Sequence, residues 1–359
     1  MSNIYSLIMA GGSGTRFWPR SREKKPKQFL SVLGNETLIQ NSVNRFLPIT
    51  PKENIYIISK LIQQEEIVKQ NLTINLENII FEPTGKNTLP CIGLASLFIQ
   101  GKDPDGIIIV SPSDQLVDNL PVFREAIHTA CSIAENYNGI VTIGITPSYP
   151  ATGYGYIRTE NKISTITGTD AFKVKCFVEK PDSATASQYC SSGEYFWNSG
   201  IFVFKCSVLW EAMKKFAPDI FASLSEIGKF IGTSQYNEKL NKIYNAISAI
   251  SIDYAIMEKA DNVYLVKGDF IWNDLGGWEQ VYELTDKDEF RNATVGNVLL
   301  EDVENSYIYS EKGIIAIMGV KDLLVVQDGN ATLVCKRERS EDIKKIVERL
   351  RLKGLTEYY

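Results

Sequence analysis

Short apolar runs alternate with amphipathic segments along the first 145 residues. The runs predict strands at 4–10, 54–59, 78–81, 106–110 and 139–145. The amphipathic segments between them predict helices at 37–47, 60–71, 88–100 and 120–136. The runs at 55–58 and 107–110 show no polar alternation, which is typical of strands covered on both faces. This order predicts an α/β fold with parallel strands joined by right-handed crossovers.

The pattern becomes mixed after residue 150. Strands are expected at 153–159, 172–179, 195–204 and 262–268, and helices near 206–217, 236–248 and 252–260. A charged stretch at 286–292 marks a boundary, after which short strand-like runs recur up to residue 335 and a charged helix follows at 340–352. We therefore expect a large α/β domain at 1–288 and a small β-rich domain at 289–359 that ends in a helix.

The first predicted strand runs into a glycine-rich loop, Gly11-Gly12-Ser13-Gly14-Thr15-Arg16, and Lys27 follows in a basic segment. Glycines let backbone N–H groups approach an anion, and the two cations add fixed positive charge. The dinucleotide fingerprint fails at its third glycine, and the Lys-Ser or Lys-Thr of a P-loop is absent. The loop favours a nucleoside triphosphate as the ligand; the alternative is a turn with a solvated basic face.

Composition narrows the classes of function. A net charge of −5 argues against a general nucleic-acid binder, and no apolar run is long enough to cross a bilayer. The N-terminal run is too short for a signal peptide, so we expect a cytoplasmic protein with reduced, mostly buried cysteines. The single histidine, His128, falls in a predicted helix and rules out a zinc site of several histidines. The chemistry must come from carboxylates, cations and backbone dipoles.

Two aspartates are candidates for a metal site. Asp114 directly follows the strand at 106–110, and Asp274 lies among glycines and aromatic residues at 272–278. Mg²⁺ is usually held by one or two carboxylates, with substrate phosphates and waters completing its shell. The alternative for Asp114 is a helix cap.

Further polar segments fit a base and a sugar. The loop at 82–90 offers Glu82, Asn87 and Thr88 for the edge of a purine, although the last two are also ordinary helix starters. The segments at 153–157, 177–181 and 197–201 combine polar groups with aromatic residues and glycine, as a sugar phosphate requires. Each of these segments alone is equally well explained as a β-turn. Ser251 is a candidate helix cap, and Asp253 lies either on that helix or toward the pocket.

Together these segments resemble the bacterial mannose-1-phosphate guanylyltransferases, also called GDP-mannose pyrophosphorylases. The resemblance covers nearly the whole chain and rests on residues 11–29, 82–88, 111–114, 153–157, 177–181, 197–200, 251–259 and 272–278. It implies a Rossmann-like (GT-A-like) nucleotidyltransferase fold with a mixed sheet flanked by helices, and a small β-helix-like C-terminal domain. The chain is too short to include the isomerase domain of the long bifunctional members.

The resemblance also implies the reaction and the site. GMP would pass from GTP to mannose 1-phosphate with Mg²⁺ as cofactor, giving GDP-mannose and pyrophosphate. The GDP-mannose would be used in polysaccharide biosynthesis. The implied catalytic residues are Arg16, Lys27, Asp114 and Asp274, and the last two are also the implied metal ligands. The implied nucleotide-binding residues are Gly11, Gly12, Gly14, Thr15, Arg16, Lys27, Glu82, Asn87, Thr88, Ser111 and Asp114. The implied sugar-phosphate-binding residues are Gly153, Tyr154, Glu179, Lys180, Asn198 and Asp253.

The sequence departs from the family pattern at Gln115, where the family usually has histidine after the metal aspartate. Three alternatives stay open: another nucleotide or hexose 1-phosphate, a catalytically silent sugar-nucleotide sensor, and, least favoured, a nicotinamide dehydrogenase. We expect small-molecule substrates and neither a nucleic-acid nor a membrane partner. Dimerisation through the C-terminal domain is a hypothesis from analogy.

Overall fold

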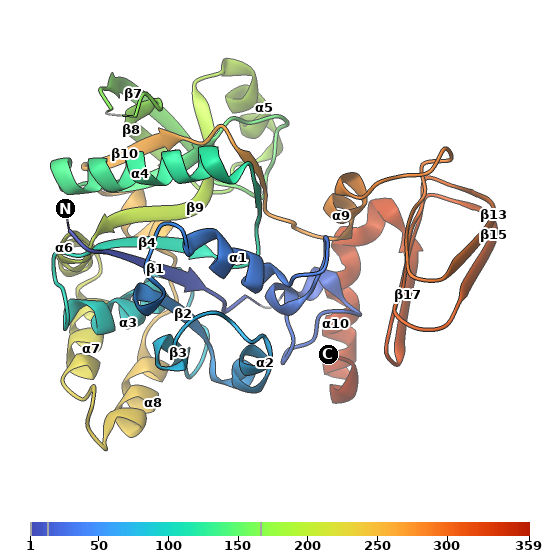
Figure 1. Ribbon diagram of the computed structural model, residues 1–359, viewed down its shortest axis with the longest axis horizontal. Coiled ribbons are helices and arrows are strands. Elements are labelled where there is room, and N and C mark those ends of the chain that lie inside the picture. Colours follow the sequence, from blue (N-terminus) through green and yellow to red (C-terminus); the bar gives the residue numbers. More distant parts are fainter. Residues whose placement is uncertain (1, 13, 166) are drawn as a thin grey trace.

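The computed structural model describes residues 2–12, 14–165 and 167–359 (Figure 1). Within these residues the largest sheet has nine strands, in the order β3-β2-β1-β4-β9-β6-β10-β8-β7. In sequence order, the strands are β1 (Ile4–Met9), β2 (Ile55–Lys60), β3 (Ile79–Glu82), β4 (Ile107–Pro112), β6 (Ile140–Ile145), β7 (Tyr156–Ile163), β8 (Ala171–Val178), β9 (Tyr195–Lys205) and β10 (Val263–Lys267).

The sheet is mixed, as the family resemblance implies. The alternation of strands and helices alone predicts a wholly parallel sheet, and this prediction is wrong. Strands β3, β2, β1 and β4 are parallel, with Ile8 beside Ile57 on one side and beside Ser111 on the other. Strand β9 separates β4 from β6 and runs antiparallel to both. It also pairs antiparallel with β7, which is itself antiparallel to β8. The reversal arises because β9 enters the sheet from this antiparallel set and not through a βαβ crossover.

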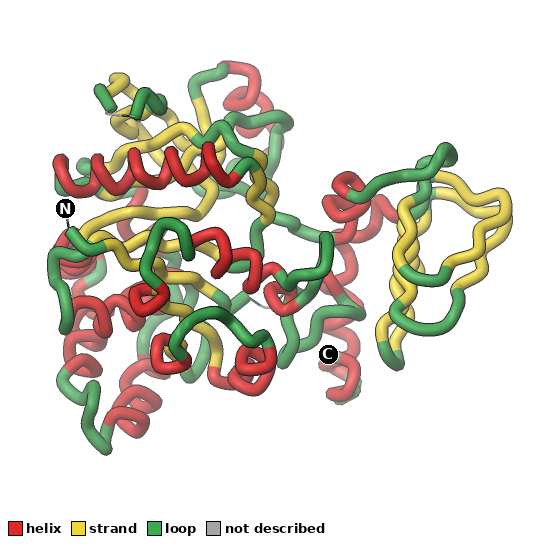
Figure 2. Tube along the Cα trace, in the orientation of Figure 1, coloured by secondary structure: helices red, strands yellow, loops and turns green. Residues whose placement is uncertain are grey.

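Helices cover both faces of the sheet (Figures 1 and 2). One core contains Leu7 and buried residues of α3 (Thr88–Gln100), α6 (Cys206–Phe216), α7 (Pro218–Gly228) and α8 (Tyr236–Ala246). The other contains Ile8 and buried residues of α1 (Leu38–Phe46), α2 (Gln64–Lys69) and α4 (Leu120–Tyr137). Neighbouring residues of a strand point to opposite faces, so an uninterrupted apolar run supplies both cores.

The sequence patterns do not predict several short helices and strands. Among them are β5 (Leu116–Asp118), α5 (Ser183–Ser192), β11 (Ile271–Asn273) and α9 (Trp278–Leu284). The helix expected at 60–71 is shorter, because the 3-10 turn η4 (Leu61–Gln63) precedes α2, and the one expected at 252–260 is the single π-turn η6 (Asp253–Met257). The remaining short turns are η1 (Thr15–Phe17), η2 (Lys27–Phe29), η3 (Lys52–Asn54), η5 (Leu76–Asn78), η7 (Arg337–Asp342) and η8 (Thr356–Tyr358).

The C-terminal part is a β-helix-like module with two stacks of strands. One stack contains β12 (Ala293–Val295), β14 (Tyr307–Ser310), β16 (Leu323–Asp328) and β17 (Ala331–Lys336), and the other contains β13 (Val298–Glu304) and β15 (Ile315–Lys321). Successive coils are parallel and in register, with Ala293 beside Tyr307 and Tyr307 beside Leu324. Helix α10 (Ile343–Leu352) follows and packs back toward the first domain (Figure 1).

A third core joins the two parts of the molecule. Phe17 and Trp18, from the loop after β1, lie in one apolar cluster with Trp278 of α9, Tyr307 of β14 and Val347 of α10. The ring centroids of Phe17 and Trp278 are 5.1 Å apart. The C-terminal helix is thereby fixed against the glycine-rich loop.

His128 lies on α4, a helix that the sequence predicts, and is exposed. The expectation of mostly buried cysteines is only half right, because Cys176 is exposed and Cys190 and Cys335 are partly so. Cys176 lies on β8 and Cys190 on α5, whereas Cys335 of β17 packs at the edge of the apolar cluster that contains Trp278 and Tyr307. None of the helices in the described part of the chain is both long and apolar enough to cross a membrane.

Candidate active site

A cavity of about 470 Å³ opens at the carboxyl end of β1, where parallel sheets bind their ligands. It brings together six of the predicted site residues from distant parts of the chain: Gly14, Thr15, Arg16, Lys27, Asp114 and Asp274. Phe17, Pro112, Gln115, Gly276 and Lys344 complete its lining. Ser13, which belongs to the same loop, lies outside the described residues.

Lys27 is the most constrained cation in this cavity. Its side chain is 6% exposed, and its ammonium donates to Oδ2 of Asp114 at 3.0 Å and to the backbone carbonyl of Asp274 at 2.6 Å. Gly14 has a φ of 55°, and a Cβ added there would overlap Lys27. Glycine is required at this position by both the backbone conformation and the close approach of Lys27. The loop and Lys27 are therefore fitted to each other.

The two predicted metal ligands are brought close by a small two-stranded sheet. β5 begins two residues after Asp114, and Leu116 pairs with Asn273 of β11, directly before Asp274. The hydroxyl of Tyr154 donates to Oδ1 of Asp274 at 2.6 Å, and burial beside this carboxylate raises the pKa of Tyr154. Tyr154 thus stays protonated and orients Asp274.

Arg16 lies at the rim of the cavity. Its guanidinium contacts Oε2 of Glu341 at 2.9 Å, with both side chains largely exposed, and the carbonyl of Gly276 lies 3.5 Å away. Glu341 belongs to η7 in the C-terminal module. The predicted phosphate-binding arginine is therefore paired with a carboxylate.

The glycine-rich loop is supported from beneath by buried polar side chains. The amide of Gln28 donates to the carbonyl of Ala10 at 2.5 Å. A Cβ at Gly11 would lie 2.9 Å from Oε1 of Glu82, which is buried and accepts from the hydroxyl of Tyr244 at 2.8 Å. Burial raises the pKa of Glu82, although Tyr244 and Lys60 act in the opposite direction. Glu82 therefore lies at the edge of the loop, close to where we predict the base.

The other predicted nucleotide residues make structural contacts. Asn87 is exposed, has a φ of 70° and caps α3 by accepting from the N–H of Thr88 at 2.8 Å. The hydroxyl of Thr88 accepts from the N–H of Ile252 at 2.9 Å, and Ser111 is fully buried at the end of β4. These three residues do not line the cavity, so their contact with a nucleotide remains a prediction.

A second polar cluster contains four of the predicted sugar-binding residues. Asn198 donates to Oδ1 of Asp253 at 3.0 Å, while its own oxygen accepts from Thr142 at 2.9 Å and from the N–H of Gly200 at 3.1 Å. Lys180 is paired with Glu179. Burial, together with the charge of Glu179, raises the pKa of Asp253 to about 6.

Glycine and aromatic residues flank this cluster. A Cβ at Gly155 would lie 2.5 Å from Oε2 of Glu179, so a side chain there would displace the carboxylate. Gly153 is exposed and has open space around it. Tyr154 packs edge-on against Trp197 and Trp272, with centroids 5.1 and 5.4 Å away. These flat surfaces connect the sugar-binding candidates to Asp274.

Gln115, the departure from the family pattern, is 7% exposed and joins three segments. Its Oε1 accepts from the indole of Trp272 at 3.1 Å, and its Nε2 donates to the carbonyl of Ser199 at 2.6 Å. Its backbone carbonyl accepts from Arg45 at 3.3 Å. The side chain therefore links Asp114 to β9 and to the segment that precedes Asp274.

Sequence reasoning missed several residues that shape the site. Gln28 stands inside a recognised motif but was given no role. Tyr244, Glu341 and Lys344 lie in helical or charged segments without any motif, and only the fold brings them to Glu82, Arg16 and the cavity. No local signal identifies such residues.

Comparisons with known proteins identify the family of this chain. The nucleotidyl transferase family model matches residues 5–290, and the model of the mannose phosphate isomerase/GMP-like β-helix domain matches residues 296–350. Mannose-1-phosphate guanylyltransferase ManC of Salmonella typhimurium is 37% identical over 364 residues, covering 100% of this chain and 75% of the relative. Xanthan biosynthesis protein XanB of Xanthomonas campestris is 36% identical over 361 residues, covering 99% of this chain and 75% of the relative.

A solved structure extends the similarity to three dimensions. The crystal structure of a protein from Thermus thermophilus, described as a mannose-1-phosphate geranyltransferase, is 30% identical with a TM-score of 0.86. The match covers 97% of this chain and 99% of that one. On the full-length similarity, the two matched domains and the shared fold, the chain belongs to the mannose-1-phosphate guanylyltransferase family of nucleotidyl transferases.

Proposed function

We propose that this protein transfers GMP from GTP to α-D-mannose 1-phosphate, giving GDP-mannose and pyrophosphate. The observation that supports this most strongly is the position of Lys27, between the carboxylate of Asp114 and the backbone of Asp274 at the mouth of β1. A buried cation held by one carboxylate and one backbone carbonyl, next to a glycine-rich loop, fits a reaction between two polyanions. Membership of the family supports the choice of GTP and mannose 1-phosphate.

The reaction is an in-line displacement. The phosphate oxygen of mannose 1-phosphate attacks the α-phosphorus of GTP, the new P–O bond forms, and the bond to the bridging oxygen of the leaving pyrophosphate breaks. This nucleophile is already an anion at neutral pH, so no general base is required. Catalysis then consists of positioning and charge stabilisation.

Each proposed role follows from position. The N–H groups of the glycine-rich loop and Thr15 bind the triphosphate, Arg16 neutralises its β- and γ-phosphates, and Lys27 moves from Asp114 toward the α-phosphate. Glu82 lies on the base side of the loop. Lys180 binds the phosphate of mannose 1-phosphate. Glu179, Asn198 and Asp253 form hydrogen bonds with the hydroxyls of the mannose ring.

Nucleotidyltransferases of this family generally use a divalent metal ion, and we propose Mg²⁺. The residues fit such an ion, because Asp114 and Asp274 supply oxygen donors in one cavity. Mg²⁺ prefers one or two carboxylates together with phosphates and water. When bound, it would offset charge on the phosphates while Tyr154 holds Asp274 in orientation.

We further propose that the enzyme acts in the cytoplasm and supplies GDP-mannose for polysaccharide biosynthesis. The xanthan biosynthesis protein among the relatives supports the second point. Dimerisation through the β-helix-like module also remains a proposal; a single protomer mass in light scattering would contradict it.

The test is an assay with purified protein, Mg²⁺, mannose 1-phosphate and each nucleoside triphosphate in turn, following pyrophosphate release. We expect release with GTP, loss of release in excess EDTA, and recovery when Mg²⁺ is restored. Release with UTP but not GTP would overturn the choice of base. Binding of GDP-mannose without turnover would identify a sensor instead of an enzyme.

A further inference from the structure

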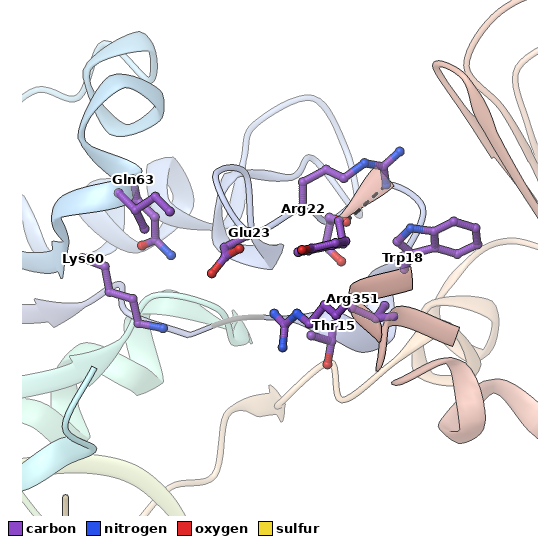
Figure 3. A pocket seen from close by; sticks show the side chains of 11 residues that line it. Thr15, Trp18, Arg22, Glu23, Lys60, Gln63 and Arg351 are labelled. Atoms are coloured by element: carbon purple, nitrogen blue, oxygen red, sulfur yellow. Dashed lines mark hydrogen bonds between the residues drawn. The ribbon is translucent and has the colours of Figure 1, made fainter. Parts of the chain in front are cut away.

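A second cavity shares Thr15 with the active-site cavity. It has a volume of about 240 Å³ and lies between η1 of the glycine-rich loop, η4 after β2, and α10 of the C-terminal module (Figure 3). Trp18 forms part of its wall, and its indole donates to the backbone carbonyl of Tyr358 at 2.7 Å. Because Trp18 also belongs to the third core, this wall is firmly supported.

Cationic side chains outnumber acidic ones in the lining of this cavity. Arg22, Lys60 and Arg351 line it, and Glu23 is the one acidic side chain among the lining residues. Figure 3 shows the side chains of Lys60 and Arg351 extending toward the same space from opposite walls. Among the residues that the structure describes, none of these three cations has a carboxylate within 4.0 Å.

Arg22 is directed away from this space. Figure 3 shows its guanidinium on the side of Trp18, whose ring centroid is 5.9 Å from Cζ of Arg22, and it donates to the carbonyl of Ser21 at 3.3 Å. Lys60 and Arg351 are therefore the two cations that an anion in the cavity would meet. The cavity therefore favours an anionic ligand.

One face of α10 contributes to both cavities. Lys344 lines the active-site cavity, whereas Val347 and Arg351, three and seven residues further on, line the second one. Residues at this spacing share one face of a helix. A ligand in the second cavity thus lies next to the active site, against the same helix and the same loop residue, Thr15.

We infer that this second cavity binds inorganic pyrophosphate. The inference rests on the proposed function, in which pyrophosphate is the leaving product. The volume is below the roughly 300–1,000 Å³ of pockets for drug-sized ligands, so a small polyanion fits better than a nucleotide. Lys60 and Arg351 can match its negative charges with charge-assisted hydrogen bonds from opposite walls. The product would be held beside the loop, separate from the site where it forms.

Calorimetric titration of the full chain with sodium pyrophosphate in metal-free buffer tests this inference. The variants are Lys60→Gln/Arg351→Gln and, as matched control, Lys353→Gln, an exposed lysine after α10 that does not line the cavity. We expect the double variant to lose one equivalent of binding that the wild type and the control both retain. Each single variant should weaken that binding about tenfold.

The inference is overturned if the double variant keeps the wild-type stoichiometry, or if the wild type binds no pyrophosphate. Thermal melting establishes that each variant is folded, and the single variants decide the matter if the double variant is not. A titration with GDP tests whether the cavity prefers free pyrophosphate to a nucleoside diphosphate. If GDP binds to this cavity as tightly as pyrophosphate does, the choice of ligand is contradicted. GDP-mannose formation by the wild type is measured separately, so a failure of the proposed function is distinguishable from a failure of this site.

Discussion

The ammonium of Lys27 donates to the carboxylate of Asp114 across 3.0 Å, although 87 residues separate the two in the chain. This contact joins the turn after the glycine-rich loop to the end of β4. The two charges form an ion pair. A triphosphate with its metal ion would replace this contact, giving Lys27 to the phosphates and Asp114 to the metal.

Replacing Lys27 with methionine keeps the length of the side chain and removes its charge. We expect kcat/KM for GDP-mannose formation to fall by about 10²–10³-fold, because single electrostatic donors of this kind contribute about 2.7–4 kcal/mol to the transition state. Steady-state kinetics with both substrates measure the effect. Lys24→Met, at an exposed position of the same segment, is the control. A loss of less than about tenfold would remove Lys27 from its proposed role.

Replacing Gln115 with alanine breaks its bonds to Trp272 and Ser199 together. The indole N–H and the carbonyl would be left without partners in a buried place, at a cost of about 1–3 kcal/mol each. We expect a lower free energy of unfolding in urea and a lower kcat, with KM for GTP little changed. Gln64→Ala, on the exposed side of α2, should alter neither quantity. Wild-type kcat in Gln115→Ala would show that the link does not position the site.

Replacing Glu341 with glutamine releases Arg16. Because both side chains are exposed, the ion pair contributes only about 0–1 kcal/mol. We expect KM for GTP to fall by up to about fivefold at low salt, and the difference to shrink as salt is added. Glu338→Gln changes a carboxylate of the same segment that pairs with Lys336 and should leave KM unchanged. A higher KM in Glu341→Gln would mean that the pair assists nucleotide binding.

The raised pKa of Asp253 predicts how stability depends on pH. The folded protein holds the proton up to about pH 6, whereas the unfolded chain releases it near pH 4. This group therefore favours folding most below pH 4, and its contribution is lost as the pH rises through 6, to a total of at most about 3 kcal/mol.

Asp253→Asn should remove this dependence and make the protein more stable than the wild type at pH 7.5. Urea unfolding at several pH values between 4.5 and 7.5 measures it, with the exposed Asp261→Asn as the comparison. Parallel stability curves for wild type and Asp253→Asn would contradict the raised pKa.

The sequence predicts the strands that form the core because apolar runs such as 55–58 and 107–110 have a single structural solution, burial on both faces. It also predicts the glycine-rich loop and Asp114, since each follows a predicted strand, and Asp274 from the glycines and aromatic residues around it. It does not predict that β9 inserts in reverse between β4 and β6, because strand order depends on contacts between distant segments. For the same reason it gives no role to Glu341 or Tyr244, which act only through tertiary contacts.

The central claim is that GMP passes directly from GTP to the sugar phosphate, with no covalent enzyme intermediate. Turnover of one diastereomer of guanosine 5′-O-(1-thiotriphosphate) with mannose 1-phosphate tests it most directly, with the configuration at the α-phosphorus of the product assigned by ³¹P NMR. A single in-line displacement predicts inversion. Retention would require two displacements, and hence a covalent intermediate, and would contradict the account.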